Sequence, residues 1–406
     1  MRALLLCLAL ATCLTLIACD NTTTSPADFT QTSAIAEPLP VSPEVPFDED
    51  ALIDAGLQVY WTKPGALKPG EKARTLYQLD ENIYYVTNFN TLVTHSAIAG
   101  NYRWRQTIGN LGQTVFAPTH ASDVAIADEP HGMKEVLDPQ SLEYTKSFDA
   151  VLINTLSYVV VIDRRTGRMV RAPGAIPFNG YAANAAGASD GANFFVPSAR
   201  GWIHTVEMAT NAEVWTESTG GTISADLVYA DNFLYAASED GAAYSFDVTN
   251  RKMEWRHQMS GPIVANFAVR KGRFAVPCKE LRLYCFDTVT GASSWTDAFV
   301  LPGKLTTPVQ LSEAAAYQFC EGAGLYAVSI ETGELLWHMP TGKKVVMVDD
   351  YKTYVLDEDD QLHVVKEATG EELAVLDFSG FDMVLSNADA PAIYAAMRNG
   401  DLFCIR

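Results

Sequence analysis

From about residue 57 to the end of the chain, short runs of alternating apolar and polar residues are separated by turns rich in Gly, Asn and Asp. This two-residue period predicts half-buried β-strands joined as hairpins. Residues 232–258, with the strand before them, show one repeat clearly, and we expect four antiparallel strands there. Its predicted strands and central turn are 225–229, 233–238, 242–247, the strand that reaches Trp255, and the turn 239–241.

A tryptophan stands at the end of most repeats, at intervals of about forty residues. A fixed period of this length, with β-rich sequence between the marks, is typical of a β-propeller. A buried indole hides about 150–250 Å² of surface, so we expect these residues to pack one blade onto the next. The predicted docking residues are Trp61, Trp104, Trp215, Trp255, Trp295 and Trp337, and Arg171 and Ala374 stand at the same place in two other repeats.

The first and last parts of the repeat region complete each other. Seven full repeats are followed by an incomplete one at residues 393–406, and residues 57–61 form an isolated strand that ends in Trp61. Joining them in one sheet removes two open edges. We therefore predict an all-β, eight-bladed β-propeller of four-stranded antiparallel blades over residues 47–406, with its ring closed by the N-terminal strand. A short helix through Asp54, capped by Asp48, is expected before it.

The N-terminal residues indicate processing and lipid attachment. The apolar run that ends at Ile17 is too short to span a bilayer as a mature helix, and Leu-Ile-Ala-Cys follows the pattern of a bacterial lipobox. We predict a lipoprotein signal peptide at residues 1–18, lipidation of Cys19, and a flexible Thr-, Ser- and Pro-rich tether at residues 19–46. The protein is then expected in the cell envelope, facing the periplasm and meeting a membrane only through its lipid. The sequence leaves open whether that membrane is the inner or the outer one.

Composition narrows the choice of partners. The formal net charge of −20 over 406 residues disfavours nucleic acid as a ligand, because phosphate groups would be repelled. Hydrophobic residues make up 48% of the chain, which is enough for a large core. We expect a monomeric propeller whose partner is another protein of the envelope.

The ends of the repeats also carry a family resemblance. Residues 324–337 read Gly-Leu-Tyr-Ala-Val-Ser-Ile-Glu-Thr-Gly-Glu-Leu-Leu-Trp, which resembles the tryptophan-docking repeat of the pyrroloquinoline-quinone-like propeller family. The resemblance covers roughly residues 55–406 and is greatest to the lipoprotein propellers of the outer-membrane β-barrel assembly machinery. It implies a non-catalytic scaffold, without a cofactor, that binds a periplasmic domain of the barrel-inserting subunit. The loops that make this contact in those propellers are short here, at residues 216–223 and 256–263, so no contact residue is transferred.

Two other functions remain as alternatives. Quinone-dependent dehydrogenases share the repeat, but this chain has no adjacent pair of cysteines, and its acidic residues 357–360 stand in a predicted turn without the spacing of a calcium loop. Residues 187–191 match the G-x-S-x-G motif but fall between strands of an all-β repeat. We therefore expect no catalytic, cofactor-binding or metal-binding residue. A carbohydrate-binding propeller is the second alternative, and Trp202 is the one Trp outside the docking positions.

The cysteines suggest one cross-link. Cys278 and Cys285 occupy matched positions on two strands of one predicted hairpin, and directly opposed positions bring Cβ atoms within bridging range. They are therefore a candidate cross-strand disulfide in an exported protein. Cys320 and Cys404 lie in other repeats and are expected to be free, buried thiols.

One stretch breaks the period. Trp104 and Arg171 are 67 residues apart, and the surplus falls at residues 112–145. Long insertions in repeat folds often lie on a binding face, so we expect a partner-binding site there. Its candidate residues are Pro118, His120, Glu129 and His131. The alternative is a solvated loop or short helix.

Overall fold

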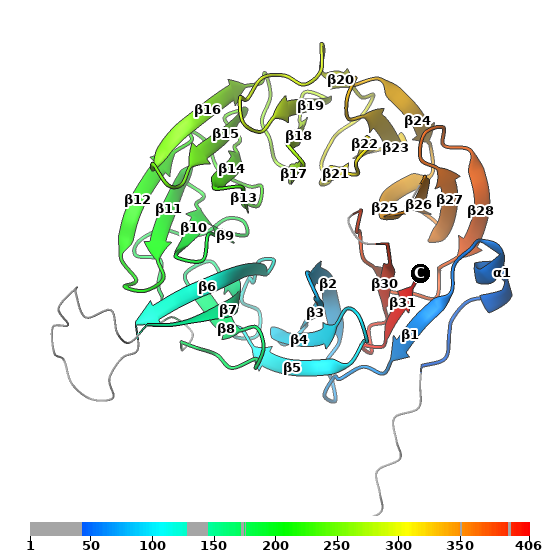
Figure 1. The fold of residues 1–406 in the computed structure, drawn as a ribbon, viewed down its shortest axis with the longest axis horizontal. Helices are drawn as coiled ribbons and strands as arrows, with labels where there is room; N and C mark the ends of the chain where they lie inside the picture. Colours follow the sequence, from blue (N-terminus) through cyan, green and yellow to red (C-terminus); the bar gives the residue numbers. More distant parts are fainter. Residues whose placement is uncertain (1–42, 128–144, 172–173, 175, 350, 389–390) are drawn as a thin grey trace, which may run out of the picture. The chain divides into compact units, whose positions relative to one another are not determined.

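The computed structural model describes residues 43–127, 145–171, 174, 176–349, 351–388 and 391–406. Its strands form eight small antiparallel sheets arranged as the blades of a ring (Figure 1). The sequence prediction of an eight-bladed β-propeller is therefore confirmed. Among the described residues, no helix has the length and hydrophobicity needed to cross a bilayer.

Seven of the blades have four strands, and the first four of these begin with the blade that joins the two ends of the fold. They consist of β1 (Val59–Lys63) with β29 (Met383–Val384), β30 (Ile393–Ala396) and β31 (Leu402–Ile405); of β2 (Ala73–Leu79), β3 (Asn82–Thr87), β4 (Thr91–Ser96) and β5 (Tyr102–Thr107); of β9 (Ala188–Ser189), β10 (Asn193–Pro197), β11 (Trp202–Glu207) and β12 (Glu213–Ser218); and of β13 (Val228–Ala230), β14 (Phe233–Ala237), β15 (Ala242–Asp247) and β16 (Lys252–Gln258).

The other three four-stranded blades follow in the sequence. They consist of β17 (Ala268–Arg270), β18 (Arg273–Cys278), β19 (Arg282–Asp287) and β20 (Phe299–Val300); of β21 (Gln310–Leu311), β22 (Ala315–Cys320), β23 (Gly324–Ser329) and β24 (Leu335–Met339); and of β25 (Gly342–Asp349), β26 (Lys352–Asp357), β27 (Gln361–Lys366) and β28 (Glu372–Asp377).

The eighth blade differs from the prediction of four strands. It contains only β6 (Thr119–Ala127), β7 (Thr145–Asn154) and β8 (Val159–Asp163), and the chain after β8 makes isolated bridges such as Tyr158 to Pro177. Pro177 has no N–H for a ladder, and Arg171 offers no large apolar side chain at the docking place. The outer strand of this blade is therefore not formed among the described residues.

The N-terminal strand lies in the same sheet as the end of the chain. β1 pairs antiparallel with β31, and Trp61 stands opposite Cys404. Before it lies helix α1 (Glu49–Asp54), whose N-cap carboxylate on Asp48 accepts hydrogen bonds from the N–H groups of Asp50 and Ala51 at 3.0 and 3.4 Å. The predicted short helix and its cap are thus confirmed.

Each docked indole lies against a glycine of the next blade. Gly100, Gly167, Gly291, Gly333 and Gly370 all have positive φ and lie beside Trp61, Trp104, Trp255, Trp295 and Trp337, respectively. A Cβ at Gly291 would come within 2.6 Å of Cγ of Trp255, so only glycine fits. The five indoles are 9% exposed or less.

A hydrogen bond completes most of these contacts. The indole N–H groups of Trp104, Trp255, Trp295 and Trp337 donate to the backbone carbonyls of Arg164, Thr288, Ile330 and Glu367, each three residues before the glycine, over 2.7–3.0 Å. At Trp61 the equivalent carbonyl, on Ala97, instead accepts from the hydroxyl of Tyr394 at 3.3 Å. Accordingly, Nε1 of Trp61 has no acceptor within the described part of the chain.

Trp215 shows what happens without the glycine. The position that would receive it is Arg251, which has φ +52°. The indole of Trp215 is only half-buried, and its N–H donates to Glu217 of its own blade at 3.2 Å. The prediction that all six Trp residues dock between blades therefore holds in full for five of them.

Ala374 has a different explanation. The blade after it is the one built from β31 and β1, so the third and fourth strands there belong to the two ends of the fold and no turn joins them. Leu52 and Leu57, from the segment around α1, are buried in the cluster against which Ala374 packs. A small side chain therefore suits this position.

The predicted disulfide is wrong. Cys278 pairs with Arg282 and Cys285 pairs with Ala275 across the β18–β19 hairpin, and both thiols are free. Because side chains alternate between the two faces of a sheet, the two cysteines point into different clusters, one shared with Trp255 and the other with Trp295. Burial raises the pKa of Cys285 to about 11. Cys320 and Cys404 are also free and buried, as expected.

The docking geometry predicts the effect of one methyl group. Gly291→Ala should lower the free energy of unfolding by about 1–3 kcal/mol more than Gly272→Ala, because the new methyl group meets the indole of Trp255. Gly272 is the matched control, since its φ of +79° resembles the +67° of Gly291 but an added Cβ there would meet only Thr288 Oγ1, at 4.0 Å. Urea unfolding of both variants measures the difference. Equal losses would contradict the account.

Candidate interaction surface

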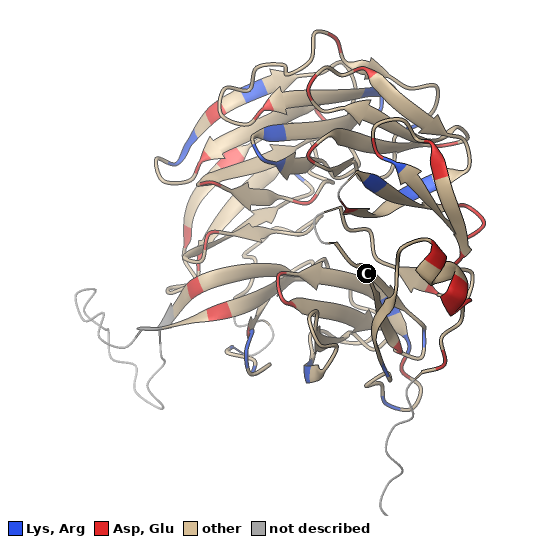
Figure 2. Cartoon of the chain, turned by 45° about the vertical axis from the view of Figure 1, so that its right-hand side comes forward, with Lys and Arg blue, Asp and Glu red and all other residues tan. Residues whose placement is uncertain are grey.

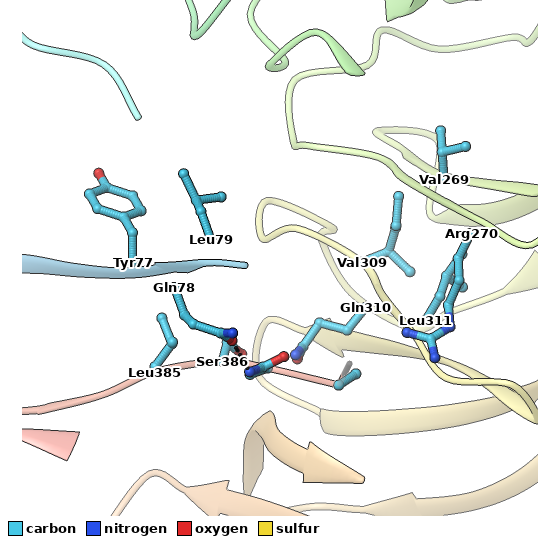
Figure 3. Close-up of a pocket in the computed structure, with 13 residues that line it drawn as sticks. Tyr77, Gln78, Leu79, Val269, Arg270, Val309, Gln310, Leu311, Leu385 and Ser386 are labelled. Atoms are coloured by element: carbon cyan, nitrogen blue, oxygen red, sulfur yellow. Dashed lines mark hydrogen bonds between the residues drawn. The ribbon is translucent and has the colours of Figure 1, made fainter. Parts of the chain in front are cut away.

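The inner strands enclose a cavity of about 350 Å³ (Figure 3). It is lined by residues of β2, β17 and β21 and by the segment that follows β29. Its polar side chains already bridge neighbouring blades: the amide of Gln310 donates to and accepts from the backbone of Val345 at 2.8 and 3.0 Å, and Ser386 Oγ donates to the same carbonyl at 2.7 Å. These groups hold blades together.

A second cavity of about 410 Å³ contains the side chain of Lys344. Burial lowers the pKa of Lys344 to about 8, and the positive charge of Lys343 lowers it further while Asp360 opposes the shift. The ammonium group donates to the carbonyl of Val384 in the next blade at 2.5 Å. At neutral pH Lys344 is therefore mainly protonated and serves as another link between blades.

The two motifs considered for chemistry have structural roles. Ser189 Oγ donates to the carbonyl of Asn193 at 2.6 Å and accepts from the N–H of Gly191 at 3.0 Å, so it stabilises a hairpin. In the acidic turn, Asp357 accepts from the N–H groups of Asp359 and Gln361 at 2.9 and 2.7 Å. Within the described residues, no group of three His, Cys, Asp or Glu side chains could hold a metal ion.

The structure describes part of the predicted insertion at residues 112–145. Residues 119–127 of it form β6, which pairs with β7 as the first strand of the three-stranded blade. Pro118 is buried and the side chain of His120 is only 11% exposed. The side chains of these two candidate residues are therefore shielded from a partner, which corrects that part of the prediction. Glu129 and His131, like Cys19 at the lipobox, lie outside the described residues.

His120 joins two blades instead. Its Nε2 lies 2.8 Å from the hydroxyl of Tyr84, and its Nδ1 lies 2.7 Å from Asp80 and 3.1 Å from Arg164. Burial lowers the pKa of His120, although the hydrogen bond to Asp80 opposes the shift. Arg164 also pairs with Asp149 at 3.0 Å, so the group is a polar link between the β2–β5 and β6–β8 blades.

Four exposed apolar side chains gather on one face of the ring. Because neighbouring strands run antiparallel, the turns between the second and third strands lie at the same end of every blade as the connections to the next blade. We call this end the loop face. It carries Phe89, Leu111, Leu156 and Trp202, whose side chains are 42%, 74%, 43% and 43% exposed. Val289 and Tyr351 lie in turns at the opposite end.

Hydrogen bonds join the loops that carry these residues. Asn90 Nδ2 donates to the carbonyls of Asn110 and Gln113 at 2.6 and 2.9 Å. The hydroxyl of Tyr158 donates to Gln113 Oε1 at 3.1 Å, which brings the Leu156 turn beside the Leu111 loop. The Leu156 carbonyl accepts from Ala183 at 2.9 Å, and Asn184 in turn donates to the carbonyl of Pro197, just before the Trp202 turn, at 3.0 Å.

The same loops are almost free of charge. Together they contain one charged residue, Arg200, in a chain with 49 acidic and 29 basic residues; the segments are 88–90, 108–118, 154–158, 179–187 and 198–202. We call them the uncharged arc. Elsewhere, acidic residues are spread over the blades and α1 (Figure 2). Exposed apolar side chains on neighbouring loops that lack charge are features of interaction sites.

Sequence reasoning found only Trp202 among these four residues. The other three were missed because they stand far apart in the sequence and belong to no motif. Aligning the repeats by their central turns would have revealed Phe89 and Leu156, whereas Leu111 lies in a connection between blades. The turns at Glu239, Glu280, Glu321 and Glu358 are acidic, whereas those at Phe89, Leu156 and Trp202 contain no acidic residue.

Known proteins resemble this chain in both sequence and fold. The family model described as outer membrane protein assembly factor BamB matches this chain at residues 155–299, 255–343 and 279–404. Together these matches span residues 155 to 404, which is more than half of the chain. BamB of Burkholderia pseudomallei is 23% identical over 36% of this chain and 39% of its own length. BamB of Moranella endobia is 20% identical over 66% of this chain and 65% of its own length.

Two solved structures share the fold. BamB from Moraxella catarrhalis superposes with a TM-score of 0.60 at 16% identity, covering 86% of this chain and 97% of that one. The computationally designed Ika8 protein superposes with a TM-score of 0.59 at 13% identity, covering 84% and 98%. At such identities the structures support the propeller fold, and the extended sequence match establishes the family. The chain therefore belongs to the family of the outer membrane protein assembly factor BamB.

Proposed function

We propose that this protein is a non-catalytic, periplasm-facing lipoprotein that serves as a protein-interaction scaffold in outer-membrane protein assembly. Family membership supports the process, and the uncharged arc on an otherwise acidic propeller is the observation that supports binding of a protein partner. The partner is a subunit of the assembly machinery, for which the periplasmic region of the barrel-inserting subunit is the specific candidate. The lipid on Cys19 holds the scaffold at the membrane.

The inner cavities fit this function better than catalysis. The polar side chains of Gln310, Ser386 and Lys344 are engaged in bonds between blades. Removing them for ligand binding would break links that hold the ring. Burial of the arc, in contrast, would cover apolar surface at no such cost.

The arc should be required for partner capture. Leu111→Asp combined with Trp202→Asp places two charges on it, and we expect at least a roughly ten-fold loss of captured assembly subunits, because charges at an apolar contact must be desolvated. Val289→Asp with Tyr351→Asp is the matched control, since these residues are 64% and 65% exposed at the opposite end. Affinity capture from detergent-solubilised envelopes, quantified by mass spectrometry, measures the effect.

Two results would contradict this proposal. One is undiminished capture by the Leu111→Asp, Trp202→Asp variant together with loss in the control. The other is dye-linked dehydrogenase activity after reconstitution of the purified protein with pyrroloquinoline quinone, which would favour the enzyme alternative.

The lipid anchor has a separate test. Cys19→Ser should abolish incorporation of labelled palmitate and move the protein from the membrane fraction to the soluble fraction, because acyl chains supply about 0.8 kcal/mol per buried methylene. Cys320→Ser, at a buried free thiol within the propeller, is the control. Retained label in Cys19→Ser would disprove lipidation at this residue.

A further inference from the structure

The uncharged arc ends in a basic segment at the β2–β5 blade. The connection that leads into β2 carries Lys68 and Lys72, both exposed. It is fixed to the first loop of the arc, because Lys72 N–H donates to Asn88 Oδ1 at 2.8 Å and Asn88 N–H donates to the Lys72 carbonyl at 3.0 Å. The backbone of this basic segment therefore lies beside the turn that carries Phe89.

The other end of the arc carries charges of both signs, because exposed Arg200 lies in the Trp202 turn and Glu239 lies just beyond it. The Trp202 turn is joined to the connection that leads to the next blade, because the N–H of Thr219 donates to the carbonyl of Gly201 at 2.8 Å. The same connection is joined to the central turn of that blade, because the N–H of Glu239 donates to the carbonyl of Thr222 at 2.9 Å. Glu239 is exposed, whereas neighbouring Asp240 is balanced by Arg256 at 3.3 Å. Glu239 already accepts a hydrogen bond from the hydroxyl of Ser224, and Arg200 brings the opposite charge, so the side of Trp202 has no net charge of one sign.

The surface around Trp202 is held in place. Tyr181 stacks on His204 with ring centroids 3.5 Å apart and on Phe178 with centroids 5.5 Å apart. Nδ1 of His204 lies 2.8 Å from a carboxylate oxygen of Glu213. Trp202 and His204 are two residues apart on β11 and so share a face of the strand. Such preorganisation lowers the entropy that a partner must overcome on binding.

We propose that the uncharged arc and the basic segment at its Lys68 and Lys72 end form one docking surface for a folded protein domain. The contact face of that domain is apolar where it meets the arc and acidic where it meets Lys68 and Lys72. This proposal rests on the scaffold function above and adds the place and the orientation of binding.

The shape and chemistry of the arc favour a protein over a sugar. Leu111 and Leu156 offer no ring for stacking, and the four apolar side chains are spread over the loops of three blades. A surface of this spread suits a protein interface, which buries about 800 Å² on each partner. The basic segment at one end favours one direction of docking, because a reversed partner would lose the contact between its acidic residues and the two lysines.

In-cell photo-crosslinking of the full-length protein tests the location. A photoreactive phenylalanine analogue at Leu111 should give a protein adduct, whereas the analogue at Val289, with 64% against 74% exposure, should give none of the same mass. Sequencing of the adduct identifies the partner and the contacted peptide. Absence of an adduct at Leu111, or the same adduct from both positions, would overturn the docking surface.

Charge reversal tests the orientation. When the crosslinking is repeated in isolated envelopes at low salt, Lys68→Glu with Lys72→Glu should lower the yield of the Leu111 adduct roughly five-fold, since two attractive contacts become repulsive. Arg165→Glu with Arg168→Glu makes the same change in net charge with exposed residues of a turn at the opposite end and should leave the yield unchanged. Equal yields in the two double variants would refute the role of the basic end. A salt-dependent adduct with a protein outside the assembly machinery would instead support the docking surface and contradict the proposed function.

Discussion

The fold depends on the contact between a tryptophan of one blade and a glycine turn of the next. The indole of Trp255 lies where any side chain on Gly291 would stand, and its N–H donates to the carbonyl of Thr288 in the same turn. Apolar burial supplies the free energy of this contact, and the hydrogen bond fixes its direction. A blade is too small to bury its faces alone, so repetition of this contact gives a stable ring.

Departures from the contact mark the places where the ring differs locally. Arg251 replaces the glycine, and Trp215 is left half-buried. Ala374 replaces the tryptophan where no turn follows, and Arg171 replaces it in the three-stranded blade. Polar links through His120 and Gln310 add to the tryptophan contact at two other interfaces, so the contacts between neighbouring blades vary in chemistry.

The repeat period made the fold predictable, whereas register and loop contacts were not. A forty-residue period and turn residues at fixed offsets were enough to place most strands, and the N-cap preference of Asp48 placed the helix before them. The pairing of Cys278 with Cys285 failed because one hairpin was aligned to another, without regard to which sheet face each residue occupies. His120 was assigned to an insertion because the sequence could not show that β6 begins inside the surplus. The uncharged arc depends on contacts between loops far apart in the sequence, although the lack of acidic residues in three central turns was visible.

The alternating direction of the strands, which builds the blades, also places the arc on one face of the ring. Every second reversal of the chain lies at the loop face, so residues that differ between repeats there gather into one surface while the docking residues stay inside. The most direct test of this account is hydrogen–deuterium exchange of the protein with and without the purified periplasmic region of the barrel-inserting subunit. Protection at residues 88–90, 110–113, 155–158 and 198–202 is the predicted result. Protection confined to the opposite end, around Val289 and Tyr351, would contradict it.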